Sequence, residues 1–173
     1  MSLKKNKIGI LGGTFDPPHK GHLSISKEAV KKFDLKKVIW AITKKNPFKA
    51  ESETTVLKRI KECKRIIGLN SFIKVKFYED IIQSNKTIDL INHLKKNKKI
   101  EIYFLMGADN LISFHKWHKS KLISQKCNIL VFDRHGYKKN SLKSKTFKQL
   151  KKGSLEFVEF NKVNISSSQL RKI

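Results

Sequence analysis

Residues 8–22 read IGILGGTFDPPHKGH: a short apolar run, a glycine pair, two prolines and two histidines three positions apart. The apolar run predicts a buried strand, and the apolar periodicity that follows predicts a helix. In α/β proteins, phosphates bind where a strand turns through glycine into a helix, because backbone N–H groups and the positive helix end point at the ligand. Glycine also lets the backbone come close to a ligand, while proline stiffens the loop.

His19 and His22 would share one face of a helical turn, since residues three apart are neighbours there. Together with Gly12 and Gly13 they indicate a site for a polyphosphate. Thr14 either donates a hydrogen bond to a phosphate or only caps the turn. The stretch is neither a Walker A loop nor a Gly-x-Gly-x-x-Gly loop. The alternative is that one histidine caps the helix and the other lies on the surface.

The order of apolar and amphipathic segments predicts an α/β fold, with a Rossmann-like, mostly parallel sheet of five to six strands and helices on both faces. Strands are expected at 7–12, 38–42, 72–78, 100–106, 128–132 and 155–160, and helices at 22–33, 52–67 and 87–96. Residues 134–153 are basic and predict a loop with a helical piece. We expect Leu57, Ile60 and Cys63 to form the buried face of the second helix. Residues 107–110 are expected to form a polar turn.

Length and cysteine content limit the classes of protein that fit. With 173 residues, the chain is expected to form one domain, residues 1–173, long enough to bury a core. We expect no membrane span, because no run of about eighteen apolar residues occurs, and no signal peptide. Cys63 and Cys127 are isolated, which favours a reduced, cytoplasmic protein over a disulfide scaffold. Whether the chain forms a homo-oligomer stays open.

The formal net charge of +25 raises the question of nucleic-acid binding. Arginine, the usual residue for bidentate phosphate and base contacts, occurs only four times. The lysines are scattered through every segment rather than clustered. We therefore expect a solvated lysine surface and no specific nucleic-acid partner, although such a surface attracts anionic substrates.

The segment 12–22, GGTFDPPHKGH, resembles the signature of the nucleotidyltransferase superfamily with a His-x-Gly-His motif. Within it, the chain is most similar to the bacterial nicotinate-mononucleotide adenylyltransferases, over residues 8–171. The resemblance implies transfer of the adenylyl group of ATP to nicotinate mononucleotide, giving deamido-NAD and pyrophosphate in NAD biosynthesis. It implies that His19 and His22 are catalytic, stabilising charge during in-line attack on the α-phosphorus. The implied ATP contacts nearby are Gly12, Gly13, Thr14 and Phe15.

Near the carboxyl terminus, residues 164–171 read NISSSQLR. Serines are good N-cap residues, which alone can account for them. The segment resembles the second motif of the family, which grips the β and γ phosphates. The resemblance implies ATP contacts by Ser166, Ser167, Ser168 and Arg171, with Arg171 also catalytic.

Two further segments resemble nucleotide contacts of the family. The run Gly107-Ala108-Asp109 matches a Gly-x-Asp motif that binds the nucleotide, since a carboxylate there can accept hydrogen bonds from ribose hydroxyls. An Asx turn that closes the strand is the alternative. Arg134, in a segment that resembles an Arg-Pro-Gly-Tyr motif, is a further candidate for ATP binding, and a plain surface role is as well supported.

The resemblance implies that a second group of residues binds nicotinate mononucleotide, the acceptor of the adenylyl group. Trp117 matches a tryptophan that stacks on the pyridine ring, although an aromatic pair three residues apart also fits a core. Thr87 falls where the family has a threonine near the nicotinate carboxylate, and Lys86 replaces a tyrosine there. Residues 46–49 resemble the family's loop after the second strand, so Asn46 and Lys49 are further candidates. For Lys49, a plain surface role is as well supported. Mg²⁺ is expected to bind mainly through the ATP phosphates, with no metal ligands from the protein.

Three alternatives remain. Phosphopantetheine adenylyltransferase, of the coenzyme A pathway, shares the fold and end motifs, but its usual pattern has a threonine at the position of His19. Nicotinamide mononucleotide is an alternative acceptor. A nonenzymatic RNA-binding protein would need clustered basic and aromatic residues, which the scattered lysines do not form.

Overall fold

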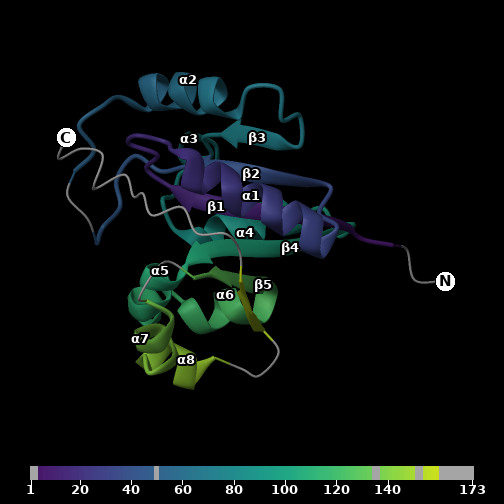
Figure 1. Cartoon of the computed structure of the whole chain (residues 1–173), viewed down its shortest axis with the longest axis vertical. Coiled ribbons are helices and arrows are strands. Elements are labelled where there is room, and N and C mark those ends of the chain that lie inside the picture. Colours follow the sequence, from purple (N-terminus) through teal and green to yellow (C-terminus); the bar gives the residue numbers. More distant parts are fainter. Residues whose placement is uncertain (1–3, 49–50, 134–136, 151–153, 160–173) are drawn as a thin grey trace.

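The computed structural model describes residues 4–48, 51–133, 137–150 and 154–159. These residues build a six-stranded, entirely parallel sheet in the order β3-β2-β1-β4-β5-β6 (Figure 1). The strands are β1 (Asn6–Gly13), β2 (Lys37–Ile42), β3 (Ile73–Lys76), β4 (Ile100–Gly107), β5 (Asn128–Phe132) and β6 (Leu155–Val158). The predicted Rossmann-like fold is confirmed.

The chain order places a topological switch point between β1 and β4. From β1 the chain moves outward through β2 to β3, then crosses back to β4 on the other side of β1. In open α/β sheets, ligands bind outside the carboxyl ends of the strands at such a point. Gly12 and Gly13 end β1 there, and Gly107 ends β4.

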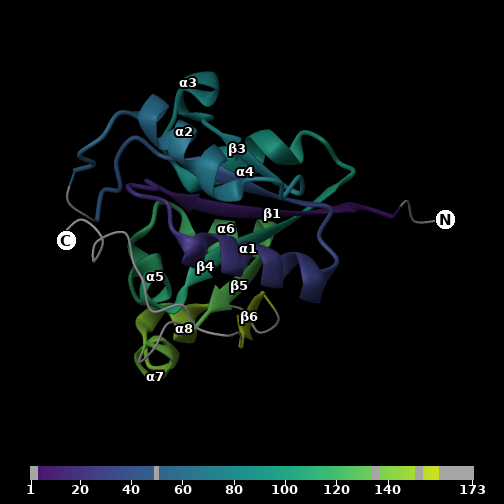
Figure 2. The ribbon, with the colours of Figure 1, turned by 45° about the horizontal axis from the view of Figure 1, so that its top comes forward.

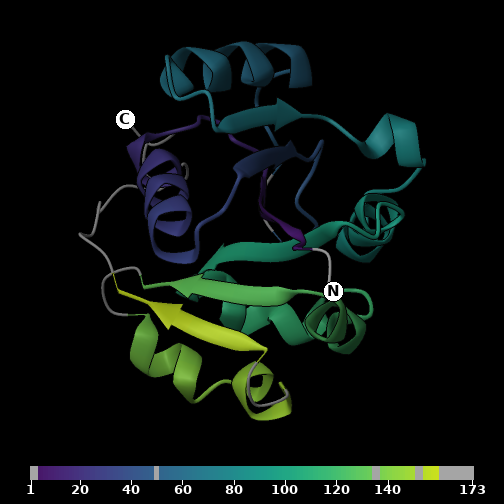
Figure 3. The same ribbon diagram turned by 90° about the vertical axis from the view of Figure 1, so that its right-hand side faces the viewer.

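Helices cover both faces of the sheet. They are α1 (Lys20–Phe33), α2 (Val56–Ile67), α3 (Glu79–Ile82), α4 (Thr87–Lys95), α5 (Ala108–Ser113), the 3₁₀ turn η1 (Phe114–Lys116), α6 (Ser120–Lys126), α7 (Lys138–Leu142) and α8 (Lys145–Gln149). Helix α1 lies along β1 (Figure 2), and Figure 3 shows α1 and α4 on opposite sides of the sheet.

Two apolar cores follow from the alternation of side chains along the strands. Ile8 and Ile10 of β1 pack with α4, α5 and α6 on one face. On the other face, Leu11 packs with the inner sides of α1 and α2. Because both faces are covered, the strands are nearly continuous in apolar residues, as is typical of parallel sheets.

Gly9 is the glycine of β1 at which a side chain would be most tightly packed among the described residues. A Cβ there would lie 3.0 Å from both Leu35 and Val38 and 3.2 Å from Leu105. The close approach of three core side chains therefore depends on the missing side chain.

The predictions differ from the structure in the second helix. It begins at Val56 rather than Ser52, after Thr55, whose side chain accepts a hydrogen bond from the Lys58 N–H. Leu57, predicted to be buried, is 79% exposed. Cys63 is buried as predicted, and Ile60 is partly buried against the core. Arg59 and Ile67 complete the buried stripe, because polar bonds described below draw Arg59 inward.

The other differences from the predicted elements concern short helices and the ends of strands. Residues 108–113 form α5 directly after β4, so the predicted turn at 107–110 is wrong. Helices α3 and α6 and the turn η1 were not expected, and the basic segment holds two short helices, α7 and α8. Strands β3 and β6 are shorter than predicted, and α1 begins two residues earlier.

Candidate active site

Helix α1 begins at the two histidines of the opening motif. His19 is the N-cap residue, and its Nδ1 accepts a hydrogen bond from the Gly21 N–H at 3.1 Å. His22 Nδ1 accepts one from the His19 N–H, also at 3.1 Å. A neutral imidazole that accepts at Nδ1 carries its proton at Nε2. Both rings therefore carry the proton on Nε2, opposite the bonds that start the helix, and Nε2 of His19 is buried.

The imidazoles rest on aromatic side chains. Their centroids are 3.8 Å apart, and Phe15 lies 4.7 Å from His22. Phe15 stacks on Trp40 at 5.0 Å and is only 1% exposed. Its ring is thus part of the core, and a contact between Phe15 and ATP would have to come from its backbone.

A cavity of about 390 Å³ opens at the carboxyl ends of β1 and β2. Its volume falls in the range of small-molecule sites. The cavity brings together six predicted site residues that are distant in sequence: Gly12, Gly13, Asn46, Lys86, Thr87 and Trp117.

The glycine pair borders this cavity without being required by the protein's own packing. Among the described residues, a Cβ on Gly12 would meet only Phe104 at 3.8 Å, and one on Gly13 only the Phe15 ring at 3.5 Å and beyond. Both are ordinary van der Waals contacts. These glycines therefore leave room on the ligand side of the backbone, in contrast to Gly9.

Trp117 forms an aromatic wall of the cavity. It packs edge-on against Phe104 at 6.0 Å and tilted against Phe114 at 5.2 Å. Phe114 is fully buried, whereas Trp117 is half-buried and reaches the cavity. Trp117 Nε1 has no hydrogen-bond partner among the residues that the structure describes. Phe114 is therefore a core residue, whereas Trp117 faces the site.

The start of α4 contributes polar groups to the cavity. Thr87 is its first residue, and Lys86 is an N-cap without a side-chain capping bond. The N–H groups and the dipole of a helix N-terminus favour a carboxylate or phosphate. Across the cavity, Asn46 Oδ1 accepts a hydrogen bond from the Phe48 N–H at 2.9 Å and so shapes the loop after β2.

Positive charge dominates the lining. Lys45, Lys86 and Lys116 line the cavity together with Glu79. Tyr78 also lines it, and burial raises the pKa of its hydroxyl, which therefore remains a hydrogen-bond donor at neutral pH. The cavity accordingly suits an anionic ligand with hydrogen-bond acceptors.

Arg59 of α2 is a site residue that sequence reasoning missed. It is 3% exposed, and its guanidinium donates to the carbonyls of Thr14 at 2.7 Å, Thr43 at 2.8 Å and Lys44 at 3.2 Å. The one available signal was its spacing of four residues before the buried Cys63. These bonds also locate Thr14, whose carbonyl faces α2.

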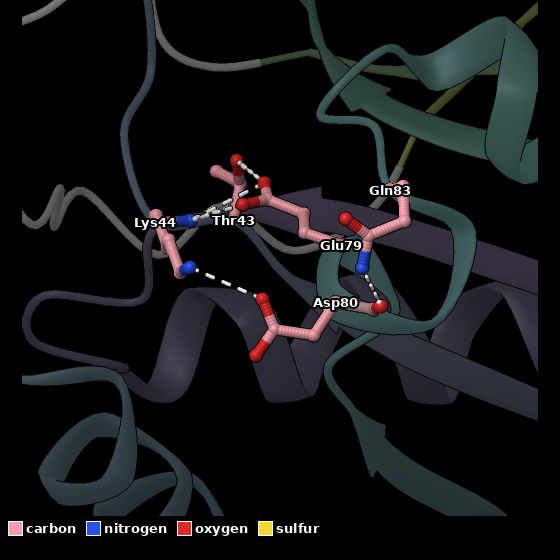
Figure 4. Close-up of polar contacts among 5 residues, drawn as sticks. All are labelled: Thr43, Lys44, Glu79, Asp80 and Gln83. Atoms are coloured by element: carbon pink, nitrogen blue, oxygen red, sulfur yellow. Dashed lines mark hydrogen bonds and ion pairs between the residues drawn. The ribbon is translucent and has the colours of Figure 1, made fainter.

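Glu79 of α3, also missed, holds the same loop from the other side. Its carboxylate accepts hydrogen bonds from the Thr43 hydroxyl and from the Lys44 N–H, the latter at 3.3 Å (Figure 4). Asp80 forms an ion pair with the Lys44 ammonium at 3.1 Å, but both groups are exposed, and such pairs contribute little. No local sequence pattern predicts this role of Glu79, because its partners Thr43 and Lys44 follow β2, far from Glu79 along the chain.

Gly107 and Asp109 lie at the switch point but not on the cavity wall. Gly107 is the N-cap residue of α5, and Asp109 is in its first turn, where a carboxylate complements the helix dipole. Their neighbour Asn110 does line the cavity. The remaining predicted site residues, Lys49, Arg134, Ser166, Ser167, Ser168 and Arg171, lie outside the described residues.

Neither a cluster of metal-ligating side chains nor a membrane-spanning helix occurs among the described residues. They contain no group of three or more His, Cys, Asp or Glu that could hold a metal ion. Among them, no helix has both the length and the apolar content needed to cross a membrane.

The sheet order, the glycine turn into a capped helix and the cavity at the strand ends define a Rossmann-type nucleotide-binding protein. Residues 10–173 match the model of the cytidylyltransferase-like family. A Pelagibacter ubique protein named "Probable nicotinate-nucleotide adenylyltransferase" is 67% identical over the whole chain and 96% of its own length. An Agrobacterium fabrum protein of the same name is 37% identical over 75% of this chain and 70% of its own.

Solved structures agree on the fold. The nicotinic acid mononucleotide adenylyltransferase of Plasmodium falciparum, complexed with NaAD, superposes with a TM-score of 0.79 at 21% identity, over 96% of this chain and 83% of its own. The same protein has been solved with APC. The chain belongs to the cytidylyltransferase-like family and, within it, to the nicotinate-nucleotide adenylyltransferases. The predicted family and enzyme class are confirmed, and this family generally uses a divalent metal.

Proposed function

We propose that this enzyme transfers the adenylyl group of ATP to nicotinate mononucleotide, giving deamido-NAD and pyrophosphate, across the cavity at the carboxyl ends of β1 and β2. The observation that carries this proposal is the meeting of Gly12 and Gly13 with Trp117 and Thr87 around one cavity. The names of the relatives and the NaAD complex of the Plasmodium protein support the same pair of substrates.

The described residues suit catalysis by alignment and charge rather than by a covalent intermediate. In adenylyl transfer, a phosphate oxygen of the acceptor attacks the α-phosphorus of ATP in line, and pyrophosphate leaves. Positioning and electrostatic stabilisation supply most of the acceleration in phosphoryl transfer. The Nε2–H groups of His19 and His22 would donate to the triphosphate as its charge shifts toward the leaving group.

The acceptor's base and its carboxylate would be held by different walls of the cavity. The half-buried Trp117 presents a flat apolar surface for a pyridine ring. The start of α4, with Lys86 and Thr87, offers N–H groups and a cation for the carboxylate. This arrangement favours nicotinate over nicotinamide mononucleotide, and it gives pantetheine, which has no aromatic ring, no partner for Trp117.

Mg²⁺ would reach the site with ATP. Its preference for phosphate oxygens and retained water fits a substrate-bound ion, which would neutralise triphosphate charge. Gly107, Asp109, Lys49, Arg134, Ser166, Ser167, Ser168 and Arg171 remain predicted nucleotide or acceptor contacts. Both cysteines are buried and free, in line with the predicted cytoplasmic location.

One assay tests this proposal against its alternatives. The protein is incubated with ATP, Mg²⁺ and one acceptor at a time: nicotinate mononucleotide, nicotinamide mononucleotide or phosphopantetheine. Pyrophosphate release is followed, and the product is identified by mass. We expect deamido-NAD as the main product. Turnover with phosphopantetheine alone would refute the nicotinate assignment, and no turnover with any acceptor would favour a binding protein.

A further inference from the structure

The buried guanidinium of Arg59 stands between two loops with different tasks. One of its three carbonyl partners, Thr14, belongs to the glycine loop between β1 and α1. The other two, Thr43 and Lys44, begin the loop after β2 that leads to the cavity residues Lys45 and Asn46. A single planar group thus joins the loop assigned to ATP and the loop that borders the acceptor.

Packing alone does not call for a charge at this position. Arg59, Cys63 and Ile67 are spaced four apart and form the buried stripe of α2, where apolar residues are the usual choice. Burying a guanidinium is costly unless hydrogen bonds compensate. Here the two terminal nitrogens donate to three carbonyls, while Nε has no hydrogen-bond partner among the described residues. Burial lowers the pKa of Arg59, and Asp16 acts in the opposite direction. Even so, a guanidinium stays protonated in proteins.

Two carboxylates also form hydrogen bonds that hold these loops. Asp16 accepts hydrogen bonds from Thr54, through the hydroxyl at 2.9 Å and the N–H at 3.2 Å, and so anchors the glycine loop. Glu79 accepts hydrogen bonds from Thr43 and Lys44, in the loop after β2. The backbone N–H of Thr43 also donates to the Gly13 carbonyl at 2.9 Å, where the two loops begin. Arg59 adds side-chain hydrogen bonds that reach further into both loops, to Thr14 and to Lys44.

We propose that Arg59 is a positioning residue for adenylyl transfer, whose guanidinium fixes the glycine loop and the loop after β2 at the separation that aligns the two substrates. This inference rests on the proposed function. Arg59 makes its bonds to backbone carbonyls and acts through these loops. Lysine at position 59 would keep the charge but lacks the planar fork that bonds several carbonyls at once.

The expected kinetic signature is a loss of kcat with little change in KM. Each loop would still bind its own ligand, but the reacting phosphates would be misaligned. A misplacement of about 1 Å can cost roughly 100-fold in rate. We expect Arg59→Lys to lower kcat by about tenfold or more, with both KM values within about threefold of wild type. Arg59→Met should lose more, so that lysine gives partial rescue.

Matched variants separate positioning from stability. Ile67→Val loosens the same buried stripe of α2 without touching either loop. It should lower Tm and leave kcat near wild type. Glu79→Gln disturbs only the loop after β2, so its effect should fall on the KM for nicotinate mononucleotide and spare the KM for ATP.

The experiment is steady-state kinetics with both substrates varied, together with thermal unfolding of each variant. A kcat for Arg59→Lys equal to that of Ile67→Val at similar Tm would overturn the proposal. A rise in only one KM with unchanged kcat would also overturn it, since Arg59 would then serve one loop. If Arg59→Met does not fold, the comparison of Arg59→Lys with Ile67→Val still decides. Wild-type turnover in the same assay tests the proposed function separately.

Discussion

His22 Nδ1 accepts a hydrogen bond from the backbone N–H of His19, and the two imidazole centroids lie 3.8 Å apart. With the bond from Gly21 to His19 Nδ1, this closes a capping box in which histidines replace the usual Ser or Thr and Glu or Gln. The bonds that begin α1 therefore also set the direction of both Nε2–H groups.

A substitution at His19 can separate capping of α1 from donation by the Nε2–H group. Asparagine is a good N-cap residue, so His19→Asn should keep the free energy of unfolding within about 0.5 kcal/mol of wild type. It removes the Nε2–H donor, and loss of one preorganised donor costs about 10²–10³ in kcat. ATP affinity should change little. The measurements are kcat, nucleotide titration and urea unfolding. Near-normal turnover in His19→Asn would show that the ring only caps the helix.

Two glycines of β1 should respond oppositely to alanine. Gly9→Ala places a Cβ 3.0 Å from Leu35 and Val38. Such overpacking costs about 1–3 kcal/mol of stability. Gly13→Ala meets nothing closer than 3.5 Å, so stability should be nearly unchanged, while affinity for ATP falls because Gly13 borders the cavity. Urea unfolding and nucleotide titration check both. Unchanged ATP affinity in Gly13→Ala would place the nucleotide elsewhere.

Trp117 should act on one substrate only. Stacking of a base on an aromatic side chain contributes about 1–3 kcal/mol. Trp117→Ala should therefore raise the KM for nicotinate mononucleotide by about tenfold or more and leave the KM for ATP unchanged. Trp117→Phe, which keeps an aromatic face, is the control and should recover most of the affinity. Equal losses for both substrates would mean that Trp117 serves the core it forms with Phe104 and Phe114.

Lys86 should favour the acid over the amide. Its side chain is exposed, so a charge interaction there is modest, about 0.2–1 kcal/mol, and screened by salt. Lys86→Gln should reduce the preference for nicotinate over nicotinamide mononucleotide by about two- to fivefold in kcat/KM. Lys98→Gln removes an exposed charge away from the cavity lining and should not alter the ratio. A ratio equal to wild type in both variants would contradict the role of Lys86.

The two cysteines predict how stability depends on alkaline pH. Burial raises the pKa of the Cys63 and Cys127 thiols from 9.0 to about 12 each. Between these values the unfolded chain releases protons that the folded protein retains, so stability should fall as pH rises through that window. Urea unfolding at pH 8, 9.5 and 10.5 should show a smaller decline in Cys63→Ala/Cys127→Ala than in wild type. A native protein that reacts with a thiol reagent at pH 8 as fast as a free thiol would contradict this burial.

Local pattern was sufficient for elements longer than a few turns or with strong apolar runs. Strand β5 has its predicted bounds, Asn128–Phe132, because four of its five residues are apolar and buried. Helices α3, α5 and α6 were missed because at four to seven residues they are too short for helical periodicity to show. The start of α2 was misplaced because Thr55, not a residue near Ser52, caps the helix. Its buried face was misjudged because Leu57 fits an amphipathic pattern yet faces solvent.

The sequence by itself determined the strand, the glycine turn and the histidine-capped helix start, since apolar periodicity and capping act between residues a few positions apart. It also indicated, through motif resemblance, that Trp117 and Thr87 belong to one site. Only the tertiary structure decided the role of Arg59, whose carbonyl partners lie 15, 16 and 45 positions away along the chain. Those bonds form only after the sheet brings the ends of β1 and β2 together beside α2, so no local pattern contains them.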